Sequence, residues 1–229
     1  MPLLRHSYNY PTRIEYGPGA ISDLPKIIKG KGLKIGLGVL AGIIIIAFIV
    51  ISWFVGHYNT LVTMEEQVTQ TWSQVENQYQ RRADLIPNLV STVKGVAEFE
   101  KETFTAVTEA RSKVNQINVN SDMLNNPQAF QQFQAAQDNL GSALSRLLVT
   151  VEKYPDLKAN ENFLQLQAQL EGTENRISVE RRNFNLAVQG FNTTIRQFPA
   201  NFIAGIAGFS QKAYFQAVAG SDVAPKVEF

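Results

Sequence analysis

Residues 35–55 form a run of 21 residues without a single charged side chain, IGLGVLAGIIIIAFIVISWFV. As an α-helix this run would be roughly 31 Å long, which matches the hydrocarbon core of a bilayer. A cleaved signal peptide has a shorter apolar stretch, about 7 to 15 residues, followed by small residues, whereas this run ends in Trp53 and Phe54. We therefore expect an uncleaved transmembrane helix at residues 35–55.

Basic residues lie on one side of this span. Four lysines precede it, Lys26, Lys29, Lys31 and Lys34, and no basic residue follows it until Arg81. By the positive-inside rule the N-terminus stays in the cytoplasm. We expect a single-pass protein of the inner (cytoplasmic) membrane, with a cytoplasmic basic segment, an extracytoplasmic helical bundle and an extended tail at residues 1–34, 56–209 and 210–229.

Small residues recur every four positions at the start of the span. Gly38 and Gly42 form one such pair, and Gly36 forms another with Gly32. This spacing lets two membrane helices approach closely, so it predicts a homo-oligomer packed through Gly36, Gly38 and Gly42. Glycine is also common in membrane helices that have no such role, and that alternative stays open.

A long apolar stripe follows the span. Its members recur at steps of three, four and seven: Leu61, Val68, Trp72, Val75, Tyr79, Ile86, Leu89, Val93, Val96, Val107, Val114 and Ile117. These steps predict one helix to about residue 117, kinked at Pro87 and weakened at Gly95. If continuous, it would be about 90 Å long and would exceed its neighbours. We therefore expect Leu61, Val68 and Trp72 to lack an intrachain partner and to pack against other copies of the chain.

Two further helices are marked by capping signals. Asn126 before Pro127 predicts a helix start, with a stripe that ends near Tyr154, and Asn160 predicts the cap of a third helix closed by Pro199. Residues 201–209 are apolar and fit a short helix that packs on the bundle or inserts in a bilayer or partner groove. No strand pattern is evident. The fold class is all-α, with a single N-terminal transmembrane helix followed by an antiparallel long-helix bundle.

The composition offers little for catalysis. The chain has no cysteine, and its two histidines are His6 and His57. The net charge of +1 provides no field that would attract nucleic acid. The arginine pairs at 81–82 and 181–182 are interpreted as solvated helix faces, with a binding patch as the alternative. We expect no enzymatic activity, no cofactor, no metal site and no nucleic-acid partner.

Several long segments resemble the LemA family, in the same order along the chain. They are YNTLV from Tyr58, RRADLIPNLVSTVKG from Arg81, EKETFTAVTEAR from Glu100, YPDLKANENFLQLQ from Tyr154, LEGTENRISVERRNFNLAVQGFN from Leu170, FPANFIAGIAGF from Phe198 and the ending APKVEF. The motif residues that carry the resemblance are Arg81, Asp84, Pro87, Asn88, Tyr154, Pro155, Lys158, Asn160, Glu161, Phe198 and Pro199. The similarity covers about residues 34–229.

The resemblance implies a membrane-anchored helical bundle with no established catalytic residues, and a range of roles that includes organising an internal or cell membrane. The expected function is a non-enzymatic scaffold or partner-binding protein whose partners are the lipid bilayer, other copies of itself and a further membrane protein. A transmembrane sensor whose bundle binds a ligand, and a membrane-organising or remodelling protein, are the alternatives. Residues 11–25, PTRIEYGPGAISDLP, instead look like the opening of iron-containing alcohol dehydrogenases. A fusion or start-site remnant is expected there, with a cytoplasmic docking tail as the alternative.

Overall fold

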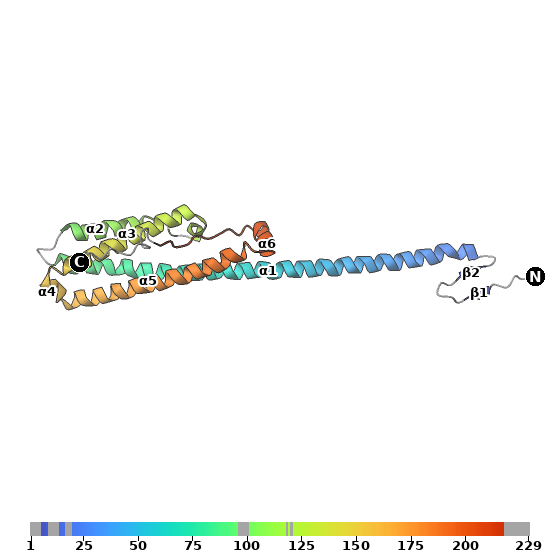
Figure 1. Ribbon diagram of the computed structural model, residues 1–229, viewed down its shortest axis with the longest axis horizontal. Helices are drawn as coiled ribbons and strands as arrows, with labels where there is room; N and C mark the ends of the chain where they lie inside the picture. The colour runs from blue at the N-terminus through green and yellow to red at the C-terminus, as the bar shows by residue number, and fades with distance from the viewer. Residues whose placement is uncertain are drawn as a thin grey trace, which may run out of the picture. The chain divides into compact units, whose positions relative to one another are not determined.

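The computed structural model describes residues 6–8, 14–16, 20–95, 101–117, 119 and 121–217. It divides into two compact units, residues 1–56 and 57–229. The helices and strands of both units are labelled in Figure 1.

The first unit contains a small hairpin and the apolar part of the longest helix. Strand β1 (His6–Tyr8) pairs antiparallel with β2 (Ile14–Tyr16), so the expectation of no strand is wrong for this short stretch. Helix α1 (Ala20–Lys94) has 75 residues and continues into the second unit. Of the described residues, only its part from Gly36 onward is long and apolar enough to cross a membrane, with a mean hydropathy of 2.8 and no buried residue in the most apolar window.

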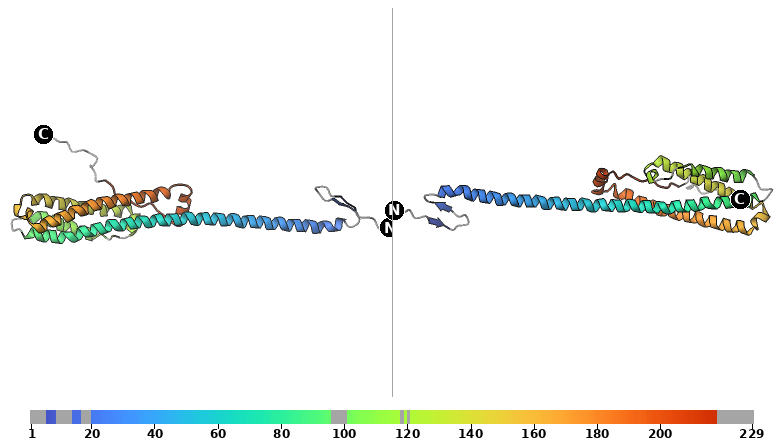
Figure 2. Two further views of the ribbon diagram at one scale, coloured as in Figure 1. Left: turned by 90° about the horizontal axis from the view of Figure 1, so that it is seen from below. Right: turned by 180° about the vertical axis from the view of Figure 1, so that it is seen from behind.

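The second unit is an up-down-up-down bundle of four long helical segments (Figures 1 and 2). The segments are the second half of α1, α2 (Lys101–Asn115), α3 (Pro127–Val151) and α5 (Glu161–Thr194). Shorter elements lie between or after them: the 3-10 helix η1 (Ser121–Asn125), α4 (Pro155–Lys158) and α6 (Ala200–Ala207). The all-α fold class is confirmed.

Two helix starts form where the capping residues predict them. The Asn126 side chain accepts hydrogen bonds from the backbone N–H groups of Gln128 and Ala129, both at 3.1 Å. The Asn160 side chain accepts from the N–H of Phe163 at 3.1 Å. Each bond satisfies a donor that the first helical turn leaves without a backbone partner, which is why asparagine specifies these starts.

The first apolar stripe is divided between two antiparallel helices, and this corrects the expectation of one continuous helix. Helix α1 passes through Pro87 and ends at Lys94. Helix α2 then runs back beside it, with the Lys94 ammonium 5.1 Å from the Phe104 ring and Arg111 donating to the Ala83 carbonyl at 3.3 Å. The fold-back allows Val107 to be buried in the same apolar cluster as Val93, which a straight helix could not do. Helix α5, which the sequence predicts to be closed by Pro199, ends five residues earlier, at Thr194.

An aromatic cluster lies in the bundle around Trp72. The Trp72 ring centroid lies 5.4–6.1 Å from those of Phe130, Phe133, Phe184 and Phe215. Leu61, Val68 and Trp72 are 0%, 0% and 3% exposed within the single chain. The expectation that these three lack an intrachain partner is therefore wrong. The 34-residue helix α5 is long enough to cover this part of α1, and Phe215, which comes after α6, packs against Trp72.

Candidate functional site

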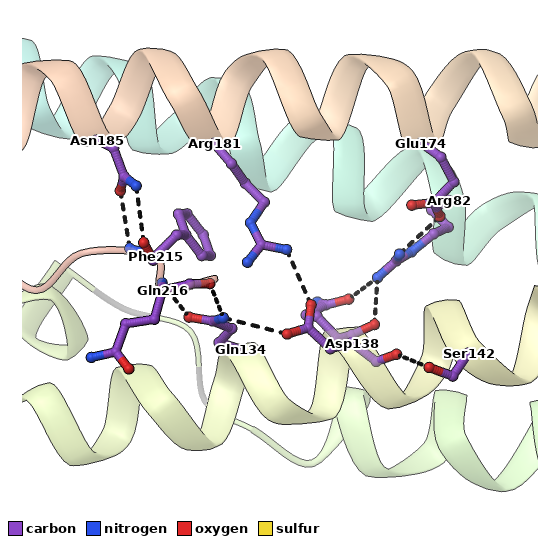
Figure 3. A network of polar contacts seen from close by, with 10 residues as sticks. Arg82, Gln134, Asp138, Ser142, Glu174, Arg181, Asn185, Phe215 and Gln216 are labelled. Atoms are coloured by element: carbon purple, nitrogen blue, oxygen red, sulfur yellow. Dashed lines mark hydrogen bonds and ion pairs between the residues drawn. The ribbon is translucent and has the colours of Figure 1, made fainter. Parts of the chain in front are cut away.

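A layer of polar side chains crosses the bundle core (Figure 3), and its α1 member, Arg82, lies about three turns beyond Trp72. Arg82 of α1 is 3% exposed, and its guanidinium donates to the Glu174 carboxylate on α5 at 2.8 Å. The same group donates to the side-chain oxygen of Gln137 on α3 and to the Gln137 carbonyl at 3.2 Å. One arginine thus connects three helices. Such charge-assisted bonds offset the large cost of removing the guanidinium from water.

A second ion pair continues the layer. The Arg181 guanidinium on α5 donates to Asp138 on α3 at 3.1 Å, and Gln134 donates to the other carboxylate oxygen of Asp138 at 3.4 Å. Arg181 also lies over the ring of Phe215, 4.4 Å from its centroid. These side chains point toward one another from α3 and α5 in Figure 3. Both carboxylates of the layer therefore face an arginine.

A cleft of about 840 Å³ opens beside this layer. It is lined by charged and small polar side chains of α1, α3 and α5, among them Arg82, Asp138, Ser142, Glu174 and Arg181. Within the described part of the chain, no group of three or more histidine, cysteine, aspartate or glutamate residues could hold a metal ion. The cleft is large enough to admit a small ligand, but most of its lining surface is apolar and its charges already balance one another.

The segment after α6 is held in the bundle by side-chain amides that imitate strand pairing. Asn192 donates to the Lys212 carbonyl and accepts from the Lys212 N–H, both at 2.9 Å. Asn185 bonds both backbone groups of Phe215 at 2.9 and 3.0 Å, and Gln134 bonds both of Gln216 at 2.8 and 3.0 Å. We call Asn192, Asn185 and Gln134 the amide clamps. They satisfy backbone groups that an extended segment inside a helical bundle would otherwise leave unpaired.

The clamped segment also contributes side chains to the core. Phe215 is buried, with its ring centroid 4.8 Å from that of Phe130 and 5.5 Å from that of Phe184. The ammonium of the buried Lys212 bonds Glu65 and, at 2.7 Å, Asn125. Residues 210–217, the described part of the segment expected to be an extended tail, thus contribute to the core. Residues 218–229 lie outside the described residues.

The motif residues predicted from sequence are mostly on the surface. Arg81, Asp84, Pro87 and Asn88 share the exposed face of α1. Tyr154, Pro155, Lys158, Asn160 and Glu161 form the α3–α5 connection, where Lys158 pairs with Glu152 and Asn160 caps α5. Phe198 is exposed, and Pro199 follows it in a cis peptide bond. A Cβ atom added at Gly36, Gly38 or Gly42 would meet no described atom within 4 Å, so packing within the chain does not require these glycines.

The polar layer is what the sequence interpretation missed, since it treated both arginine pairs as solvated faces. Arg82 and Gln137 occupy positions of the apolar stripes, because Arg82 lies three residues after the buried Tyr79 and Gln137 lies four residues after the buried Phe133. Arg181 lies three residues before Phe184 in the same way. Polar residues at the spacing of the buried apolar ones therefore indicated the polar layer in the sequence.

Tyr79 lies against this layer and predicts an alkaline limit to stability. Burial raises its pKa from 10.0 to about 12, an effect that Arg181 and Arg82 oppose. The folded state therefore keeps the phenol proton that the unfolded chain releases above pH 10, and stability falls as the pH rises from 10 to 12. The loss approaches about 2–3 kcal/mol at 1.36 kcal/mol per pKa unit.

Tyr79→Phe tests this expectation. Among the described residues no hydrogen-bond partner reaches the Tyr79 hydroxyl, so its removal should leave stability at pH 7 unchanged or raised by up to about 1 kcal/mol. Denaturant titrations at pH 7 and pH 11, followed by circular dichroism, should show a smaller alkaline loss in the variant. An equal loss in both proteins would contradict the assignment to Tyr79.

The fold and the site together define a class: a helical-bundle protein with a long apolar N-terminal helix and a polar layer inside the bundle. A family model described as the LemA family matches residues 71–229, and the chain belongs to that family. It is 28% identical over 212 residues to magnetosome protein MamQ 2 of Paramagnetospirillum magneticum, covering 86% of this chain and 77% of the relative.

Two further relatives agree. The chain is 28% identical over 205 residues to magnetosome protein MamQ of Magnetospirillum gryphiswaldense, covering 81% of this chain and 74% of the relative. It is 28% identical over 164 residues to protein LemA of Metamycoplasma hominis, covering 72% of this chain and 71% of the relative. The described family and relatives support a membrane-associated helical protein.

Proposed function

We propose that the protein is a non-enzymatic, membrane-anchored scaffold that presents its helical bundle outside the cytoplasm. The observation that carries the proposal is the apolar part of α1, whose large side chains from Leu37 to Val55 are exposed almost without exception. A run of this length and hydropathy is unstable in water, and a bilayer removes it from water at no cost to the backbone, whose bonds are internal to the helix.

The chemistry of the bundle supports a role carried out by surfaces. A general acid or base must reach a substrate with a proton to exchange, yet Glu174 and Asp138 are each engaged by an arginine. Arg82, the most buried of these groups, bonds partners on two other helices. These contacts support a structural role for the layer, which leaves the outer faces of the bundle for partners.

Topology is tested with single cysteines, since the chain has none of its own. Cysteine replaces Lys26 before the span or Val149, which is 70% exposed on α3. A membrane-impermeant maleimide applied to intact spheroplasts should label position 149, and should label position 26 only after lysis. Labelling of 149 that requires lysis would contradict an extracytoplasmic bundle.

Self-association is proposed for the membrane span alone, since Leu61, Val68 and Trp72 are buried in the monomer. The open space around Gly38 and Gly42 supports a close helix–helix contact there. Light scattering in mild detergent should give a mass above one chain for the parent and a lower mass for the Gly38→Leu, Gly42→Leu variant. Ile44→Leu, on the other side of the helix, is the matched control and should not change the mass. A monomeric parent would contradict this part of the proposal.

Organisation of a membrane is a more specific form of the same function. Two relatives are named as magnetosome proteins, so the homology favours a role at a membrane-bound compartment or at the cell membrane itself. A deletion strain examined by electron microscopy should show altered membrane form if the proposal holds. Unchanged membranes would limit the protein to partner binding.

A ligand sensor is the second candidate, and the cleft of about 840 Å³ is the observation that favours it. A ligand there would lie against Arg82 and Arg181, whose present partners come from different helices. Extra electron density in this cleft, in protein purified from its native membrane, would favour the sensor over the scaffold.

A further inference from the structure

Helix α6 has two distinct faces. Ala200, Ile203 and Ala204 are buried, and they turn toward the bundle. Phe198, just before the helix, and Phe202 and Ile206 within it are 86%, 67% and 63% exposed. Phe202 and Ile206 are four residues apart, which places them on one side of the helix, and Phe198 comes just before the Pro199 cap. Exposed large apolar side chains grouped in this way mark a contact surface, because a soluble surface seldom gathers them.

The end of α6 contacts a residue of α1 that comes soon after the apolar span in the sequence. The residue that follows the helix cap is Phe209, and its ring centroid lies 5.9 Å from that of Tyr58 on α1. Tyr58 comes three residues after Val55, so it stands about 5 Å beyond the end of the span along the helix. The headgroup layer on each side of the hydrocarbon core is about 5–7 Å thick. With the span anchored as proposed, Tyr58 falls in the headgroup layer, and its contact with Phe209 brings the end of α6 there.

The charge of this region suits a lipid surface. Between Arg196 and Ala217 the chain has no aspartate or glutamate, so nothing on the segment opposes contact with phosphate groups. Arg196 is exposed two residues before Phe198. Aromatic side chains are favoured at the membrane–water boundary, and a short amphipathic helix there lies in the plane of the interface.

We infer that α6 is an interfacial helix that inserts Phe198, Phe202 and Ile206 into the outer surface of the same bilayer that holds the span. The inference rests on the proposed membrane anchor. The bundle would then have two separate attachments to the membrane, the span and α6.

Single cysteines labelled with an environment-sensitive fluorophore test the inference in full-length protein reconstituted into phosphatidylcholine–phosphatidylglycerol vesicles. Cysteine replaces Phe202 on α6, Ile46 in the span or Val149 on the exposed surface of α3. Nitroxide-bearing lipids should quench the label at 46 and at 202 and leave the label at 149 unaffected. Aqueous iodide should show the opposite order.

Three outcomes would overturn the inference, and they are distinguishable. Lipid quenching at 46 without quenching at 202 would leave the anchor intact and remove the contact of α6 with lipid. Shielding of 202 from iodide without lipid quenching would mean that protein, such as a second copy, covers the helix. Absence of lipid quenching at 46 would overturn the anchor itself and the inference with it.

A variant adds a second measurement. With the label at position 198, the Phe202→Ser, Ile206→Ser change should weaken insertion by roughly 100-fold, because two large apolar side chains no longer leave water. Quenching at 198 should then fall to the level seen at 149. The matched control is Leu186→Ser on α5, which is 59% exposed and should leave quenching at 198 unchanged. Undiminished quenching in the double variant would contradict insertion through this face.

Discussion

Replacing Trp72 by alanine is expected to lower the free energy of unfolding of the bundle by about 4 kcal/mol. The indole is 3% exposed, and its ring lies against four phenylalanines from α3, α5 and the clamped segment. Because these rings come from three parts of the chain, they cannot all move to fill the space that the indole leaves. Denaturant titration of the full chain in mild detergent, followed by far-ultraviolet circular dichroism, measures the loss.

The matched control for Trp72 is Leu186→Ala, since Leu186 is 59% exposed on α5 and its truncation should change stability by less than about 0.5 kcal/mol. The measurement also separates a core role from an interface between copies. A core residue lowers stability equally at every protein concentration, whereas an interface residue makes the loss depend on concentration. Equal losses for Trp72→Ala and Leu186→Ala would contradict the aromatic core.

Replacing Arg82 by alanine should have the second largest effect, a loss of roughly 3 kcal/mol, the lower end of the range for breaking a buried ion pair. The lower end is expected because Glu174 is 44% exposed and can be hydrated once its partner is gone. Gln137, in contrast, is buried, so water cannot replace the charged donor that its side-chain oxygen loses. The same denaturant titration of the full chain measures the loss.

The neighbouring residue is a close control. Arg81→Ala removes the same charge from the next position, but Arg81 is exposed, so the expected change is below about 0.5 kcal/mol. Thermal unfolding should rank the proteins with Arg82→Ala clearly below the parent and Arg81→Ala beside it. If the two variants lost stability equally, the polar layer would have no role in holding the three helices together.

Much of the bundle could be predicted because its signals are local. The Asn126 and Asn160 caps act on N–H groups two or three residues away, and both form as expected. The apolar stripes of α3 and α5 name residues that are in fact buried, such as Leu140 and Phe184. A helix period and a capping side chain depend only on neighbouring residues, so they can be recognised without knowing the rest of the fold.

The failures share a cause, which is that partners distant in the chain decided the outcome. The chain turns back after Lys94 because Val107 can then be buried in the same cluster as Val93. The spacing of the apolar residues is the same whether or not the chain turns there. Leu61, Val68 and Trp72 were assigned to other copies because the cover provided by α5 and by Phe215 is more than 100 residues away. The spacing of apolar residues along a helix identifies the face that must be buried, but it does not identify which segment buries it.

By itself, the sequence determined that this chain is helical, that one stretch is too apolar to remain in water, and where two helices begin. Each of these depends on residues within a few turns of one another. Only the tertiary structure decided that Arg82 is buried while Arg81 is exposed, and that Asn185 and Asn192 hold an extended segment in the core. The physical reason is that a buried polar group is stable only when partners surround it, and here those partners lie 20 to 92 residues away.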